Sequence, residues 1–517
     1  MTRRWPPWTF GSGAAVGALG SRLCALISLA AWLSLGSQVR VLIGSRGLLP
    51  VGEFMDAVRA DGRVSPFELP TLLWRFHSDG VLVGGTIVGA ALALAALFGL
   101  WPRLCFALST ALYLSYATVS RDFLSFQWDN LLLECGLLAA LLPTTRPAPL
   151  VHFLFRVVLF KLYFESGIAK WQSDLGDWQD GSAMTYYYQT APLPTWLAFT
   201  AYHLPVWWHH LESRATLLLE LGVPFLIFGP RRARLFAAFV FSFFQICNAA
   251  TANYGFFCYL AAALSVFLLD DVDVARAGAQ AARLVPSAVR RGVTRLLAFR
   301  VRRVSAQAEE NPPPTPVTKA RWIGRAGAAL FLLVSLTDAL YAFTEPGRAL
   351  GVVAPLFELN RRFRLVNSYH LFASITRERI EPELQTLAAG TDAARADDES
   401  APWTPQYFWH KPGDPRRAPD FVAPHQPRVD FQLWFYGLAF RRREPAYVST
   451  LVERMCEDPA AVQPLFRQPL PPHPAAVRLV YWRYEFASRA ERRETGVWWQ
   501  RARVAMSRAV PCPGGNR

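Results

Sequence analysis

The sequence predicts an α-helical multi-pass membrane bundle with a C-terminal extracytoplasmic domain that is β-rich or α+β. Three observations support this fold class. Of the 517 residues, 52% are hydrophobic and only 18% are charged, whereas a typical soluble domain carries about 25% charged residues. Apolar stretches that approach the roughly 20 residues of a bilayer-spanning helix recur as far as residue 343. Beyond that point, shorter aromatic-rich segments alternate as strands do.

Nine apolar stretches are candidate membrane helices, and because several are short the expected range is five to nine. In chain order they are residues 23–43, 81–101, 104–120, 130–142, 150–167, 215–228, 235–249, 256–269 and 324–343. Arg3 and Arg4 precede the first stretch, and no cleavage-like end follows it. This pattern is typical of a retained signal anchor rather than a removed signal peptide.

The chain accordingly divides into four parts. They are a membrane region over 1–270, a basic cytoplasmic loop with a Pro-rich linker over 271–323, a last transmembrane helix over 324–343 and the C-terminal domain over 344–517. In this last domain the patterns predict strands at 365–376, 379–387 and 479–486 and a helix at 487–505.

The distribution of basic residues sets the expected orientation. Lys and Arg exceed Asp and Glu by 54 − 39 = 15, and basic residues cluster in residues 271–321 and in the turn 229–234 (GPRRAR). Because cytoplasmic loops are rich in Lys and Arg, the N-terminus and both segments are predicted to be cytoplasmic. Nucleic-acid binding would need a basic stripe with base-reading groups in one module. Membrane lipids, and not nucleic acid, are therefore the predicted partners.

No motif predicts a cofactor or a metal. The seven Cys residues form no CxxC pair, and neither a phosphate-binding loop nor a dinucleotide fingerprint is present. His209 and His210 stand near Glu212 but have no third ligand at usable spacing. The sequence does not decide whether Cys456 and Cys512, both predicted to lie outside the cytosol, form a disulfide.

Charged residues inside the predicted helices mark candidate sites, because each costs about 2.5–3.5 kcal/mol in a bilayer unless it has a partner. They are Lys161, Glu165, Glu134, Glu220 and Asp338, with Asp129 at the outer rim. Lys161 and Glu165 are four residues apart and share one helix face, so they can pair with each other or point together into the bundle. Ion pairs that fix helix packing are the favoured interpretation. A transporter that uses Lys161, Glu134 and Glu220 as a charge relay is an alternative.

Three residues are candidates for catalysis, and none is assigned: Lys170, Glu165 and Asp174. Lys170 follows Gly167 at the outer end of a predicted helix and precedes an acidic, aromatic loop that contains Asp174 and Trp178. A Lys against an apolar wall can lose basicity and act as a base or nucleophile. The favoured interpretation is simpler, with the Lys170 side chain reaching from the membrane edge into solvent.

Five blocks of sequence, in this order, resemble the lipase maturation factor family. They are residues 123–138 (FLSFQWDNLLLECGLL), 155–194 (FRVVLFKLYFESGIAKW to TAPLP), 366–376 (VNSYHLFASIT), 411–438 (KPGDPRRAPDFVAPHQPRVDFQLWFYGL) and 480–486 with 491–499. The motif positions within them are Gln127, Trp128, Asp129, Gly167, Lys170, Trp178, Asn367, Ser368, Tyr369, Lys411, Pro412, Gly413, Asp414, Pro424, His425, Gln426, Pro427, Arg428 and Trp434.

The resemblance implies a multi-pass membrane protein and favours a non-catalytic role over an enzyme. In animals such proteins reside in the endoplasmic reticulum membrane, where they support the folding and assembly of secreted lipases. Secreted client proteins are therefore implied partners, and the C-terminal domain is implied to be lumenal. The Ala- and Arg-rich composition is also typical of a high-GC bacterial genome, in which case the membrane would be the plasma membrane.

A second, local resemblance covers residues 163–184 and points to a different class of function. This stretch is similar to the membrane region of vitamin K-dependent γ-carboxylases, with the carboxylase base falling on Lys170. The alternative function is therefore an integral-membrane enzyme that uses Lys170 as base or nucleophile. An enzyme needs Lys170 in a concave pocket with carboxylates in reach, whereas a folding factor needs exposed apolar surface on the outer side.

Overall fold

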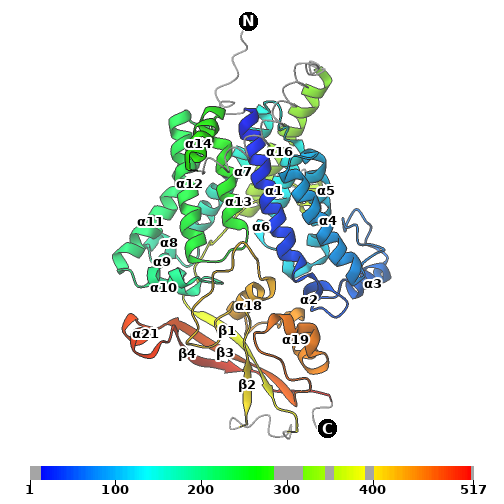
Figure 1. Cartoon of the computed structure of the whole chain (residues 1–517), viewed down its shortest axis with the longest axis vertical. Coiled ribbons are helices and arrows are strands. Elements are labelled where there is room, and N and C mark those ends of the chain that lie inside the picture. Colours follow the sequence, from blue (N-terminus) through cyan, green and yellow to red (C-terminus); the bar gives the residue numbers. More distant parts are fainter. Residues whose placement is uncertain (1–12, 285–317, 344–353, 391–400, 514–517) are drawn as a thin grey trace.

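A computed structural model describes residues 13–284, 318–343, 354–390 and 401–513. The predicted Pro-rich linker, most of the basic loop, and Arg3 and Arg4 lie outside these ranges. Figure 1 shows a bundle of helices above a smaller domain built on a β-sheet. The start of α1 (Ala14–Gly36) and α14 (Asp271–Leu284) lie at the end of the bundle farthest from the sheet.

Most of the predicted apolar stretches form helices of the bundle. Besides α1 these are α4 (Asp79–Leu97), α5 (Pro102–Val119), α6 (Gln127–Leu141), α7 (Pro149–Trp171), α11 (Val206–Gly222), α12 (Arg231–Thr251), α13 (Phe257–Leu264) and α16 (Thr318–Phe343), whereas α14 belongs to the predicted basic loop. Shorter helices at the end nearest the sheet are α2 (Val39–Ile43), α3 (Val51–Asp61), α8 (Asp177–Asp180), α9 (Ala183–Thr190) and α10 (Trp196–Tyr202), and α17 (Ala354–Phe363) follows α16.

The number of membrane spans is not settled by helix length. Among the described residues, four helices are long and apolar enough to cross a membrane: Ala14–Gly36, Asp79–Leu97, Arg231–Thr251 and Trp322–Phe343. Two of the other predicted spans form short helices, 15 residues in α6 and 8 residues in α13. The nine-span count therefore stays a prediction, while the mostly helical bundle is confirmed.

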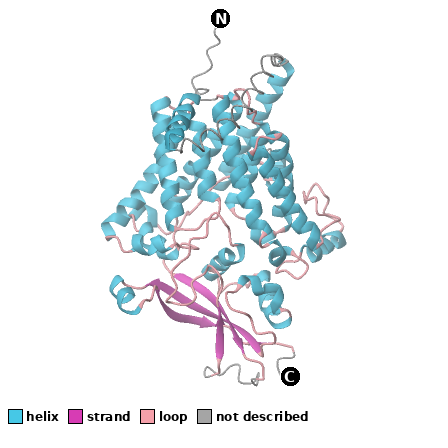
Figure 2. Ribbon diagram, in the orientation of Figure 1, coloured by secondary structure: helices cyan, strands magenta, loops and turns pink. Residues whose placement is uncertain are grey.

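The C-terminal domain is an antiparallel sheet with helices packed beside it (Figure 2). Its strands are β1 (Arg379–Leu387), β2 (Trp403–Gln406), β3 (Ala476–Phe486), β4 (Trp499–Met506) and β5 (Val510–Pro511), in the order β2-β1-β3-β4 with β5 on β3. The helices include α18 (Arg428–Leu438), α19 (Ala446–Glu457) and α21 (Arg489–Thr495).

Two of the strand predictions are confirmed and two other predictions in this domain are wrong. Strands occupy residues 379–387 and 476–486. Residues 365–376 form no strand, for a reason given below. The predicted helix at 487–505 is reduced to α21, because Gly496 adopts φ 75° and turns the chain into β4.

A disulfide joins Cys456 of α19 to Cys512 after β5, 56 residues apart. We expect Cys512→Ser to lower the free energy of unfolding of the domain by about 4 kcal/mol, because the bond closes a long loop in the unfolded chain. Urea titration of the detergent-solubilised protein, followed by limited proteolysis, measures this loss. Cys247→Ser removes an exposed free thiol and is the matched control. Equal urea midpoints for the two variants would contradict the expectation.

Candidate functional site

The third family block, residues 366–376, is the centre of the candidate site; we name it the anchor loop. It follows α17, precedes β1 and lies against the ends of α6, α7 and α8. Its backbone N–H groups donate to side chains of the bundle, so they are not free to pair with a neighbouring strand. This is why the alternating pattern of the segment does not produce a strand.

Glu134 and Glu165 hold the first half of the anchor loop. The fully buried Glu134 carboxylate accepts hydrogen bonds from the Asn367 backbone N–H at 3.2 Å and from the Tyr369 hydroxyl. Glu165 accepts from the backbone N–H of Tyr369 at 2.8 Å. Lys161 donates to Glu134 at 3.1 Å and not to Glu165 on its own helix. The predicted charge cluster is therefore an inter-helix ion pair with a peptide segment bound to it.

Lys170 and Glu220 hold the second half. The Lys170 ammonium lies 2.7 Å from a Glu220 carboxylate oxygen and donates to the Leu371 carbonyl, also at 2.7 Å. The Trp178 ring centroid is 5.2 Å from the same nitrogen. Lys170 is only 1% exposed, so the interpretation of a side chain that reaches into solvent is wrong. The anchor loop closes over it.

Further polar groups of the bundle complete the contact. Asp177 accepts from the Ile375 N–H at 2.7 Å, and the Trp178 indole donates to the Phe372 carbonyl at 3.2 Å. Gln127 accepts from the His370 N–H at 2.9 Å, and Asp338 of α16 hydrogen-bonds Ser368. Of the catalytic candidates, Asp174 is exposed and takes no part.

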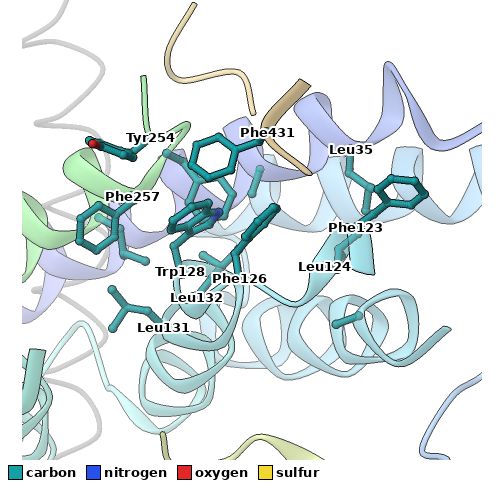
Figure 3. Close-up of a cluster of buried hydrophobic side chains, with 14 of the residues drawn as sticks. Leu35, Phe123, Leu124, Phe126, Trp128, Leu131, Leu132, Tyr254, Phe257 and Phe431 are labelled. Carbon is teal, nitrogen blue, oxygen red and sulfur yellow. The ribbon is translucent and has the colours of Figure 1, made fainter. Parts of the chain in front are cut away.

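A second contact joins the bundle to α18 and the turn before it. Arg428 donates to both oxygens of Asp129, at 2.9 and 2.8 Å, and both side chains are 0% exposed. The Tyr113 hydroxyl adds a bond to Asp129 at 2.6 Å. Figure 3 shows the Phe431 ring of α18 beside Trp128, and their centroids are 5.2 Å apart. The ion pair and this aromatic contact both join α18 to the bundle.

The turn before α18 reaches the end of α1. The Gln426 N–H donates to the Ser34 hydroxyl at 2.8 Å, and the Gln426 carbonyl accepts from the Gln38 side chain at 2.7 Å. The Ser34 hydroxyl also lies 3.0 Å from His425 Nδ1. Ser34 and Gln38 are site residues that the sequence reasoning missed. Their signal is the presence of polar side chains at the end of an otherwise apolar first helix.

The remaining motif positions shape these contacts. Lys411 pairs with the buried Glu381 of β1, which also pairs with Arg379 at 2.6 Å. Gly413 lies too close to the Tyr407 ring for a side chain, and Gly167 lies against Glu220 in the same way. Other motif residues lie in turns or make single contacts: Pro412, Asp414 bonded to the Arg416 N–H, Pro424 after the cis Ala423–Pro424 bond, Pro427 before α18, and Trp434 bonded to the Thr190 carbonyl.

The burial of His425 is expected to make stability depend on pH. Burial, with His410 and Arg428 nearby, lowers the pKa of His425 to about 4. The unfolded chain, with a His pKa of about 6.5, binds more protons between these values, so stability is lost as the pH falls through that window. We expect a loss of about 1–2 kcal/mol between pH 7 and pH 5.

Thermal unfolding of the detergent-solubilised protein at both pH values measures this loss. His425→Asn, which keeps a neutral hydrogen-bonding side chain, should reduce the pH dependence. The exposed His473 gives the matched control, His473→Asn, which should keep it. An unchanged pH dependence in His425→Asn would show that this residue is not responsible.

Both halves of the chain match known family domains. The lipase maturation factor transmembrane domain matches residues 18–276, and the lipase maturation factor C-terminal domain matches residues 365–509. Lipase maturation factor 2 of Homo sapiens is 30% identical over 92% of this chain and 80% of its own length. Lipase maturation factor 1 of Bos taurus is 30% identical over 93% of this chain and 86% of its own length. No solved structure matches the chain. With both domains matched and its apolar helices in place, the chain belongs to the lipase maturation factor family of membrane proteins.

Proposed function

We propose that the protein is a non-catalytic, membrane-embedded maturation factor that assists the folding and assembly of secreted lipases or other exported proteins. One observation carries the non-catalytic part. The charged residues that could do chemistry in the bundle are engaged by the anchor loop, and Lys170 is only 1% exposed. The names of the family relatives support lipases as clients.

The position of the C-terminal domain and its disulfide support a domain that acts outside the cytosol. The domain lies at the opposite end of the bundle from the start of α1 and from α14 (Figure 1). It also holds the disulfide between Cys456 and Cys512, and such bonds persist in oxidising compartments. The compartment would be the endoplasmic reticulum lumen, or the space outside the plasma membrane if the source is bacterial.

A folding factor needs exposed apolar side chains that can hold a partly folded client. Trp409 and Phe421 are 42% and 53% exposed. Arg467 brings their segments together, because it donates to the Trp409 carbonyl at 2.6 Å and to Asp420 at 2.9 Å. We propose this aromatic pair, within and beside the fourth family block, as part of the client-holding surface.

The test is the secretion of an active lipase from cells that lack the protein. Trp409→Ser/Phe421→Ser should reduce the activity per secreted molecule of the client by about 5-fold or more, since hot-spot aromatic residues are each worth at least ~1 kcal/mol. Val504→Ser/Val510→Ser, a matched pair of exposed apolar residues on the sheet, should rescue fully. If the aromatic variant folds and also rescues fully, the proposed surface is wrong.

The alternative, an enzyme that uses Lys170, is favoured by one observation. The Lys170 ammonium has a carboxylate at 2.7 Å and an aromatic wall, which resembles the surroundings of a reactive Lys. In such an enzyme the anchor loop would have to open to admit a substrate. The Lys170 variants in the Discussion separate the two functions.

A further inference from the structure

A cavity lined by three arginines lies between α10 and α21. Its lining residues are Phe199, Thr200, Arg489, Arg492 and Arg493, and its volume is about 520 Å³. None of the three arginines has an ion-pair partner among the described residues. Glu491 lies on the same helix, but its carboxylate accepts a hydrogen bond from the Gln500 side chain and does not pair with any of the three arginines. The cavity therefore concentrates uncompensated positive charge.

One of the three arginines is held in place before any ligand arrives. The Arg492 guanidinium lies 3.6 Å from the centroid of the Trp498 ring and 5.0 Å from that of Phe199. Stacking of this kind restricts the side chain while leaving its N–H groups able to donate. A group that binds them then loses less freedom to ordering of the protein.

The neighbouring side chains place the cavity at a membrane surface. Trp207, Leu211 and Leu218 of α11 are all exposed, and their spacing of four and seven residues puts them on one helix face. The exposed Arg214 lies on the same face, and its long side chain can reach from an apolar surface to the headgroups. In a membrane bundle such a face contacts lipid. Trp196 of α10 and Trp207 are 50% and 65% exposed at the outer end of this face, and Trp is the residue that marks the level of the lipid headgroups.

We propose that the cavity binds the phosphate of an anionic phospholipid headgroup in the leaflet nearest the C-terminal domain. The planar, permanently charged guanidinium group forms paired hydrogen bonds to phosphate oxygens. A lipid, rather than free phosphate, is favoured because Phe199 of the cavity and the exposed Trp196 belong to the same helix, and an exposed indole is typical of the headgroup level in membrane proteins. The bound lipid would connect α21 of the sheet domain to the membrane surface.

Binding of phosphatidylglycerol to the purified full chain in detergent micelles tests the proposal, with the shift in melting temperature as the readout. Arg489→Gln/Arg492→Gln/Arg493→Gln should raise the apparent Kd by about tenfold or more. The sequence offers a matched control, Arg441→Gln/Arg442→Gln/Arg443→Gln, which removes the same charge from three exposed arginines of the same domain. This control should change the Kd less than about twofold.

Three outcomes would overturn the proposal. One is an equal loss of binding in both triple variants, which would indicate a non-specific charge effect. Another is equal binding of phosphatidylglycerol and phosphatidylcholine. The third is full competition by inorganic phosphate at the lipid concentration, which would indicate a free-phosphate site. If the triple variant does not fold, Arg493→Gln alone should raise the Kd by about threefold, and an unchanged Kd would be equally decisive.

Discussion

Arg428→Met is expected to lower the free energy of unfolding by about 3–5 kcal/mol and to detach α18 from the bundle. The substitution leaves the Asp129 carboxylate buried at 0% exposure, with only the Tyr113 hydroxyl as a hydrogen-bond partner. It also leaves the Phe123 carbonyl without the bond at 2.6 Å that Arg428 donates. Arg364 interacts with Asp129 only at longer range, and a buried carboxylate that has lost its ion-pair partner is among the most destabilising defects that one substitution can produce.

Two further variants test whether the loss of stability in Arg428→Met comes from the broken ion pair or from the substitution of any arginine. Arg428→Met/Asp129→Asn removes both charges, so we expect it to recover at least half of the lost stability. Arg442→Met removes an exposed arginine and should change stability by less than about 0.5 kcal/mol. Thermal unfolding and limited proteolysis of the detergent-solubilised protein report both effects. A double variant no more stable than Arg428→Met would show that the unpaired carboxylate is not the cause.

Lys170→Met is expected to lower the free energy of unfolding by a similar ~3–5 kcal/mol and to abolish client maturation. The buried Glu220 carboxylate loses its partner at 2.7 Å, and the Leu371 carbonyl loses its donor. The anchor loop would then lose one of its attachments to α7, and the C-terminal domain would be less firmly placed. Loss of function in this variant alone therefore does not indicate catalysis.

The double variant Lys170→Met/Glu220→Gln decides between the two functions. It removes the unpaired charge, so a folding factor should regain most of its stability and of its client yield. An enzyme that uses the Lys170 amine would regain stability but no activity. The measurements are the melting temperature and the activity per secreted lipase molecule in cells that lack the protein. Restored stability without restored lipase activity would overturn the non-catalytic proposal.

The sequence was sufficient to predict the kind of molecule and the identity of its buried charges. Hydropathy and the change of pattern after residue 343 predict a helical bundle with a sheet domain, and the structure has both. Glu134, Lys161, Glu165 and Glu220 are buried, as expected of charges inside apolar helices. These features depend on composition and local periodicity, which a single sequence records directly.

The partners of those charges could not be predicted. Spacing along a helix allows Lys161 to pair with Glu165 or both to point into the bundle, and it names no partner there. The structure gives Glu134 on α6 to Lys161 and the Tyr369 backbone N–H to Glu165. Every residue except Pro has a backbone N–H group, so the residue type does not show which N–H will bind a buried carboxylate. For the same reason the anchor loop was mistaken for a strand, and the burial of Lys170 was missed because Leu371 lies 201 residues further along the chain.

The helices that bind the anchor loop are translated well before the anchor loop itself, because the two lie far apart in the sequence. Glu134 and Asn367 are separated by 233 residues, so α6 and α7 are synthesised long before the ribosome has translated their partner. During that interval the carboxylates have only Lys161 and Lys170 to neutralise them. The carboxylates of the bundle therefore lack the anchor loop until the last third of the chain has been made.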